Sequence, residues 1–125
     1  MSYSADAEPV AQAVCHCADC QRQTGSPFSV IVAVPRDALQ VEGDTIATYS
    51  TTGDDHGQET DRSFCSACGA PVFSISAAMP EMAFVKAGSL DDASWVEPGV
   101  EVWTSSAQSW SPHFEGAAQL ERGPQ

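Results

Sequence analysis

Five cysteines in two tight clusters are the residues of this chain best suited to chemistry. The first cluster, Cys15 to Cys20, reads CHCADC and has a C-x-C-x-x-C pattern, and the second, Cys65 to Gly69, reads CSACG. Two intervening residues let a tight turn bring both sulfurs onto one tetrahedral ion, with Zn–S bonds of about 2.3 Å. Gly69 can adopt a positive φ, which would let backbone N–H groups point back at the sulfurs. The spacing predicts zinc on Cys15, Cys17, Cys20, Cys65 and Cys68.

The pattern allows two ways of sharing these sulfurs, with one or two zinc ions per chain. In the first, Cys17 and Cys20 join Cys65 and Cys68 in one closed four-cysteine site, which leaves Cys15 unused. In the second, the first cluster alone provides three ligands, and the fourth position stays open as in a catalytic zinc site. Three thiolates give such a centre a net charge of about -1, which weakens its ability to acidify water. An open centre would therefore favour thiol chemistry.

The charge balance argues against several partners. Seventeen acidic residues face five basic ones, and the formal net charge is -12. Nucleic-acid binding depends on Lys and Arg at phosphates, so we expect no nucleic-acid partner, and an anionic membrane is disfavoured for the same reason. No stretch approaches the roughly 18 apolar residues of a membrane span, and the first residues lack the pattern of a secretion signal. We expect a cytoplasmic protein, where an odd number of cysteines suits metal binding better than disulfides.

Short β-strands are the elements expected to position the cysteines, within one domain that covers residues 1–125. Apolar or alternating runs bounded by Gly, Pro and Asp predict strands. These runs lie at residues 28–34, 39–41, 45–52, 71–76, 82–87 and 100–104. The polar stretch 53–61 is predicted to be an exposed loop, with His56 solvated or, as the alternative, acting as a proton shuttle or ligand. The tail from about residue 116 is predicted to be disordered. Five aromatic residues are expected in the core, namely Phe64, Phe73, Phe84, Trp95 and Trp103.

The cysteine motifs closely resemble those of the glutathione-dependent formaldehyde-activating (GFA) family, also called the centromere-protein-V/GFA domain. Residues 15–28 (CHCADCQRQTGSPF) match its CHCxxCQRxTGxPF signature, and residues 62–69 (RSFCSACG) match its RxFCxxCG element. Residues 87–92 (AGSLDD) match AGxLDD, and Trp110 stands where the family often has a late tryptophan. The resemblance covers about residues 14–114.

This resemblance implies a mainly β fold with little helix, the β-tent of small antiparallel sheets clamped by zinc. It also implies a carbon–sulfur lyase activity on a thiol–aldehyde adduct such as S-hydroxymethylglutathione. By position, Cys15, Cys17 and Cys20 would form the labile catalytic zinc site, and Cys65 and Cys68 would be half of a structural site, which supports the second pairing. The family takes its other two structural ligands from an N-terminal C-x-C pair that is missing here. We therefore expect an upstream start or a shortened fragment.

Three other polar residues lie within or beside the cysteine motifs. Arg22 and Arg62 flank the cysteine motifs and are either ordinary surface ion pairs or substrate-binding groups that hold the carboxylates of an anionic thiol. His16 is expected to point away from the metal as a partly exposed structural residue.

Three kinds of function fit the sequence. The first is a zinc-dependent carbon–sulfur lyase whose partner is a small-molecule thiol or thiol adduct resembling glutathione. The alternative is a non-catalytic, zinc-stabilised protein-binding module. A third possibility is an assembly subunit that acts only as a homodimer. A labile zinc that responds to thiols would indicate the enzyme, whereas one tightly held ion indifferent to thiols would indicate the module.

Overall fold

The computed structural model describes residues 1–123 and has a mainly β architecture with one α-helix. The strands are β1 (Ser2–Ala5), β2 (Ala11–Cys15), β3 (Ser29–Pro35), β4 (Leu39–Glu42), β5 (Ile46–Thr52), β6 (Glu59–Cys65), β7 (Pro71–Ser76), β8 (Met82–Lys86), β9 (Val100–Val102) and β10 (Ala118–Gln119). Helix α1 spans Ala18–Thr24, and 3-10 turns lie at Arg36–Ala38, Ala87–Ser89 and Thr104–Ser106. No helix among residues 1–123 has the length and apolar character to cross a bilayer. The expected mainly β fold with little helix is confirmed.

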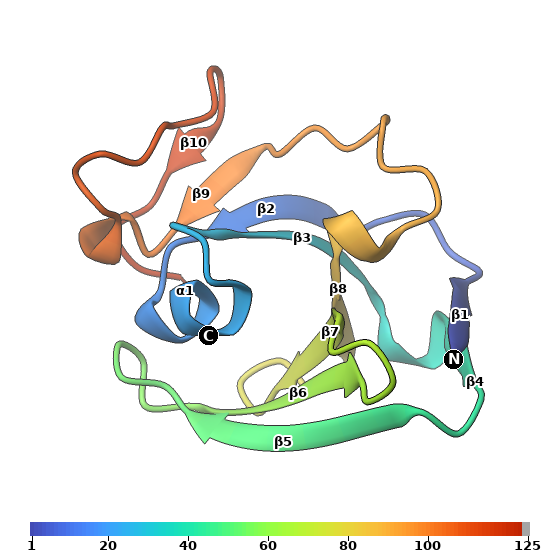
Figure 1. The fold of residues 1–125 in the computed structure, drawn as a ribbon. Helices are drawn as coiled ribbons and strands as arrows, with labels where there is room; N and C mark the ends of the chain where they lie inside the picture. Colours follow the sequence, from blue (N-terminus) through green and yellow to red (C-terminus); the bar gives the residue numbers. More distant parts are fainter. Residues whose placement is uncertain (124–125) are drawn as a thin grey trace.

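Eight strands form one sheet in the order β10-β9-β2-β3-β8-β7-β6-β5, and β1 pairs with β4 in a separate ribbon. The pairs are antiparallel except β2 with β9 and β9 with β10, which are parallel. Figure 1 shows the sheet bending around α1, which lies between β2 and β3 on one side and β5 and β6 on the other. The strand that carries Cys15 therefore has a neighbour on both edges, while the helix that carries Cys20 sits inside the bend.

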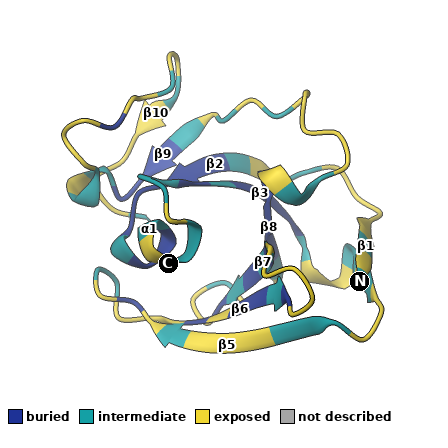
Figure 2. Ribbon diagram, in the orientation of Figure 1, coloured by how far each residue is buried: buried dark blue, intermediate teal, exposed yellow. Residues whose placement is uncertain are grey.

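The central strands provide the core. Strand β3 reads SVIVAVP, and its apolar side chains pack on both faces. Val32 packs with Val85 in one cluster, and Ile31 packs with Phe84 in another. Figure 2 shows the same pattern, with buried residues concentrated in β2, β3 and β8 and exposed ones along β5. The prediction of a strand buried on both faces is confirmed for this run.

Several elements differ from the sequence-based expectation. Strands β1, β2 and β6 carry no strong apolar alternation and were not predicted. The stretch 53–61 is a loop only as far as residue 58, because β6 begins at Glu59 and buries the polar residues Thr60 and Arg62 against its neighbours. Trp95 is 46% exposed, so its expected place in the core is wrong.

The tail expected to be disordered from about residue 116 contains β10, which pairs with β9 through its backbone. Such pairing completes an open sheet edge without requiring any side-chain pattern, so sequence periodicity gives no sign of it. Residues 124–125 lie outside the described part of the chain.

Candidate metal centre

The C-x-C-x-x-C motif spans the end of a strand and the start of a helix. Cys15 is the last residue of β2, and Cys17 is the N-cap of α1, where its Sγ accepts the backbone N–H of Cys20 at 3.4 Å. The helix ends at Gly25, whose left-handed φ of 64° suits a glycine at this position. The strand end and the first helical turn thus direct three cysteines to one place.

The three sulfurs lie within 4.8 Å of one another, and their side chains belong to residues that are at most 4% exposed. Zn–S bonds of about 2.3 Å place the sulfurs of a tetrahedron about 3.8 Å apart, so small adjustments suffice to hold an ion. Thiolates are soft ligands that favour zinc over magnesium or calcium. Cys15, Cys17 and Cys20 could therefore hold a metal ion through three sulfur ligands. Cys65 and Cys68 lie outside this group, as the second pairing expects.

The pKa values of these three thiols are shifted in different directions in the metal-free protein. Hydrogen bonds from Cys15 and Cys17 lower the pKa of Cys20 well below its ordinary value. Hydrogen bonds to Cys17 and to Cys20, together with burial, raise the pKa of Cys15. The three thiols are therefore coupled, and the cluster titrates as a unit.

Lys86 provides one positive charge beside the sulfurs. This residue ends β8, is 7% exposed, and donates from Nζ to the hydroxyl of Ser29 at 2.7 Å. Ser29 is the partner of Cys15 in the β2–β3 register. Burial lowers the pKa of Lys86, and the neighbouring cysteine thiolates, Cys20 first, oppose that shift. Lys86 was not predicted as a site residue, although a lysine at the end of an apolar strand is unusual enough to be noticed.

Arg62 provides the second positive charge. It lies in β6, is 2% exposed, and donates to Thr51 Oγ1 at 3.0 Å and to Gln23 Oε1 at 2.7 Å. Its buried Nη2 has no hydrogen-bond partner among residues 1–123. Lys86 and Arg62 both lower the pKa of Cys20, after the two thiols. Neither Lys86 nor Arg62 forms a salt bridge with a carboxylate of residues 1–123.

The two arginines flanking the cysteine motifs thus have different positions. Arg22 is 65% exposed in its side chain and bonds to Asp54 Oδ2 at 2.6 Å, with Asp19 at 3.6 Å. This is the surface ion pair that the sequence also allowed, whereas Arg62 lies beside the sulfur cluster.

One wall of the cluster is formed by the residues at the end of β9. Val102 and Trp103 pack against the three cysteines, and Trp103 adopts a left-handed φ of 57°, which is uncommon for a bulky residue. The ring of His56 lies on Trp103 with centroids 5.7 Å apart. His56 is half-buried in the 53–58 loop, so the prediction of a solvated side chain is wrong.

His16 is also placed differently from the expectation. It is fully buried, and its Nε2 lies 2.8 Å from Glu101 Oε1, which also bonds His113 Nδ1 at 2.9 Å. The expected partial exposure is wrong because β9 pairs with β2 and brings Glu101, itself fully buried, against the histidine. His16 does not join the three sulfurs, but its ring nitrogen lies with Glu101 and His113 in a second group whose ligand atoms are within 4.8 Å of one another and could hold a metal ion.

The second cysteine pair lies at the turn between β6 and β7. Thr45 Oγ1, 3.5 Å from Cys65 Sγ, and the backbone N–H groups of Cys68 and Ala67 lower the pKa of Cys65 to about 7. Gly69 has a φ of 79°, as predicted for a turn that directs N–H groups at a sulfur.

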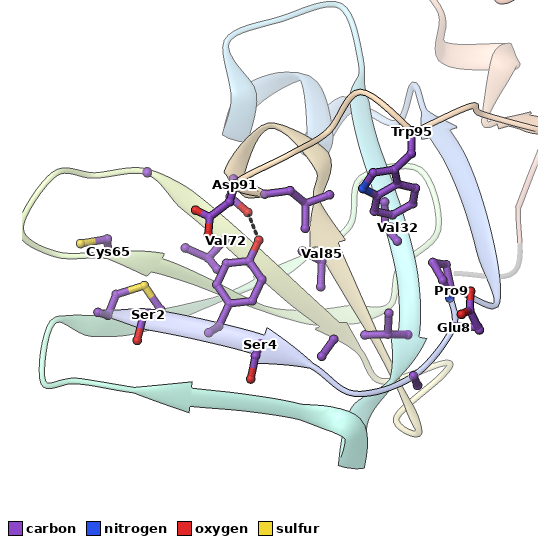
Figure 3. Close-up of a pocket in the computed structure, with 18 of the residues that line it drawn as sticks. Ser2, Ser4, Glu8, Pro9, Val32, Cys65, Val72, Val85, Asp91 and Trp95 are labelled. Atoms are coloured by element: carbon purple, nitrogen blue, oxygen red, sulfur yellow. Dashed lines mark hydrogen bonds between the residues drawn. The ribbon is translucent and has the colours of Figure 1, made fainter.

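Cys65 and Cys68 line a cavity of about 620 Å³ between β1 and the main sheet. Figure 3 shows Cys65 at one end of it, Pro9 and Trp95 at the other, and valines of the sheet between them. None of Cys15, Cys17 and Cys20 lines this cavity, so the two cysteine clusters face different environments.

The family model described as "Glutathione-dependent formaldehyde-activating enzyme" matches residues 1–106 of this chain. The chain belongs to the GFA family. A solved structure, a crystal structure of a Rhodobacter sphaeroides protein, is similar to this GFA chain with a TM-score of 0.54. The two are 16% identical, and the match covers 94% of this chain and 86% of the other, which supports the fold alone. No curated protein matches the chain significantly.

Proposed function

We propose that this GFA protein is a zinc-dependent carbon–sulfur lyase that acts in the cytoplasm on the adduct of a thiol and an aldehyde, such as S-hydroxymethylglutathione. The observation that carries the proposal is a buried three-sulfur cluster accompanied by two buried cations without carboxylate partners. Family membership gives independent support, because the family is described by glutathione-dependent formaldehyde activation.

The charges around the cluster favour one more anion. Buried cations are costly unless they are paired, and this chain is otherwise strongly acidic. A divalent ion on three thiolates carries about one negative charge, so Lys86 and Arg62 leave the centre with about one positive charge. One substrate thiolate would neutralise that excess.

A bound zinc ion would supply the positive charge that keeps a fourth sulfur deprotonated at neutral pH. Cys15, Cys17 and Cys20 would hold the ion, and burial of the three residues keeps bulk water from the sulfurs. Lys86 and Arg62 would attract the incoming thiolate and disfavour its reprotonation. In the cleavage direction, the C–S bond breaks with its electron pair on sulfur, while the hydroxyl proton leaves and a carbonyl forms.

Exchange spectroscopy can test this activity. Zinc-loaded protein would be added to glutathione and ¹³C-formaldehyde, and the rate of adduct formation and cleavage would be measured by NMR above the solution background. We expect acceleration by the wild type and none by Cys20→Ser, with direct binding of reduced glutathione measured by calorimetry. If the wild type holds zinc but leaves the exchange rate at background and binds no thiol, the lyase proposal is wrong and the protein-binding module is favoured.

A further inference from the structure

A second group of possible metal ligands lies at the strand end that carries the cysteine motif. His16 directly follows β2, Glu101 lies in β9, and His113 lies in the irregular segment before β10. The backbone N–H of His16 donates to the carbonyl of Val102 at 3.1 Å, which continues the parallel pairing of β2 with β9 (Figure 1). Strand pairing therefore brings the carboxylate to a histidine 85 residues away in sequence.

Both histidine rings contact the same carboxylate oxygen. Glu101 Oε1 lies 2.8 Å from His16 Nε2 and 2.9 Å from His113 Nδ1, and the three atoms lie within 4.8 Å of one another. Zinc bonds of about 2.0–2.2 Å to nitrogen and oxygen place the ligand atoms of one ion about 3–3.5 Å apart, so small side-chain shifts would admit an ion. The other oxygen, Oε2, accepts the backbone N–H of Phe114 at 2.9 Å, and a bond of this kind orients a ligating carboxylate.

The charge of Glu101 has no permanent counter-charge. The side chain is fully buried, and its ion-pair contacts among residues 1–123 are with the two histidines and not with a lysine or arginine. Neutral imidazoles satisfy the hydrogen bonds of a carboxylate but do not compensate its charge, and an uncompensated buried charge is costly. A divalent cation between the carboxylate and the two rings would compensate it.

Both rings can turn a lone pair toward such an ion. A neutral His16 that donates from Nε2 leaves its buried Nδ1 without a hydrogen-bond partner among residues 1–123, so no contact prevents the ring proton from moving to Nδ1. The unpaired Nδ1–H costs less than ligation of a zinc-type ion contributes. The His113 side chain is 43% exposed, so water can accept from this ring when its proton is on Nε2.

The surroundings suit a metal that enters from one side. The ring of Phe28 lies 5.6 Å from that of His16 and 5.5 Å from that of Phe114, and this apolar shell keeps water from the buried ligands. The partly exposed His113 gives an ion a route from solvent.

We propose that His16, Glu101 and His113 form a second metal site, separate from the sulfur cluster, for a divalent transition-metal ion such as Zn²⁺. Two imidazoles and one carboxylate suit zinc and its neighbours, whereas magnesium and calcium prefer oxygen ligands. The ion would tie the end of β2 and strand β9 to the segment at His113, and its fourth position would be free for water. This inference does not depend on the lyase proposal, because it concerns metal binding alone.

NMR of the histidine rings can test the site directly. Protein with ¹⁵N-labelled histidine would be titrated with Zn²⁺, and zinc per chain would be measured at a fixed free zinc concentration. We expect the ring proton to move from Nε2 to Nδ1 in His16 and from Nδ1 to Nε2 in His113. The third histidine, His56, lies outside the group and should keep its tautomer, which makes it the internal control.

Two variants and a matched control separate this site from the sulfur cluster. His113→Ala and Glu101→Gln should each hold one zinc fewer per chain, with the affinity of that ion weakened by about 100-fold, while zinc on the cysteines is retained. His56→Ala also removes one histidine and should bind as much zinc as the wild type.

Ring tautomers of His16 and His113 that stay unchanged at saturating zinc would overturn the proposal, because a structural hydrogen-bond network would then account for the contacts. Equal zinc content and affinity in wild type and His113→Ala would also overturn it. A loss in His56→Ala as large as that in His113→Ala would indicate binding to histidines in general and would have the same consequence.

Discussion

Glu101 is the buried acid whose replacement tests most directly how this fold supports the cysteine motif. Its Oε1 accepts from His16 Nε2 at 2.8 Å and from His113 Nδ1 at 2.9 Å, and its Oε2 accepts the backbone N–H of Phe114 at 2.9 Å. Because His16 lies between Cys15 and Cys17, these bonds fix the strand end on which the cluster is built. We therefore expect Glu101→Leu to destabilise the protein strongly.

The size of the loss in stability follows from the hydrogen-bond donors that Glu101→Leu leaves without an acceptor. Leucine has a similar volume but no acceptor, so His16 Nε2 and the N–H of Phe114 would lose their partners inside the protein. Each unsatisfied buried donor costs about 1–3 kcal/mol, so the free energy of unfolding should fall by about 2–6 kcal/mol. His113 is 43% exposed in its side chain and can bond to water instead, so it adds little. Such a loss is a large part of the roughly 5–15 kcal/mol that stabilises a typical domain.

Urea unfolding in a fixed metal state, followed by circular dichroism, measures this loss. Glu101→Gln keeps one acceptor oxygen and should lose an intermediate amount, while His113→Ala should cost less than about 1 kcal/mol as a partly exposed pair. Burial raises the pKa of Glu101, but the hydrogen bonds of His16, Phe114 and His113 outweigh it and lower the pKa. The stabilisation is therefore present above about pH 4.3 and is lost as the pH falls through the folded-state pKa. The reasoning is refuted if Glu101→Leu unfolds within about 1 kcal/mol of the wild type, or if His113→Ala costs as much.

Three further predictions concern the sulfur chemistry. Cys20→Ser should release the zinc of the first cluster, measured as metal per chain after dialysis, and retention of a full equivalent would contradict this site. In chelator-treated protein, alkylation of Cys65 by iodoacetamide should reach half its maximal rate near pH 7, and Thr45→Val should move that midpoint upward; an unmoved midpoint would exclude the hydroxyl as its cause. Lys86→Met should leave the free energy of unfolding unchanged or higher, because it removes a buried charge. It should also weaken thiolate binding by about tenfold, because that charge attracts the anion. An unchanged thiolate affinity, measured by calorimetry, would contradict the role of Lys86.

The local patterns of the sequence predict much of this structure. The two cysteine motifs, C-x-C-x-x-C and C-x-x-C-G, form turns whose shape depends on a few adjacent residues. The three-sulfur cluster and the Gly69 turn could therefore be predicted. The apolar run in β3 is equally local and was recognisable. These features need no knowledge of which strands become neighbours.

The missed features depend on pairing between distant strands. His16 is buried because β9 lies alongside β2, and nothing near His16 in sequence indicates Glu101 as its partner. Likewise, Lys86 reaches the cluster because β8 pairs with β3, which also pairs with β2. The polar sequence of β6 suggests a surface strand, yet Arg62 is buried beside thiolates. Long-range neighbours of this kind leave no periodic signal.

The separation of 85 residues between His16 and Glu101 also has a consequence for biosynthesis. The cysteines of the first motif emerge from the ribosome long before β9 has been translated. During that time the β2 edge that pairs with β9 has no partner, and the thiols of the motif can react with metals and oxidants. Pairing across such a distance is slow to form. If the motif binds zinc as proposed, an ion captured by the nascent chain would hold the motif in shape during that interval, and the timing of metal supply would then affect how the protein folds.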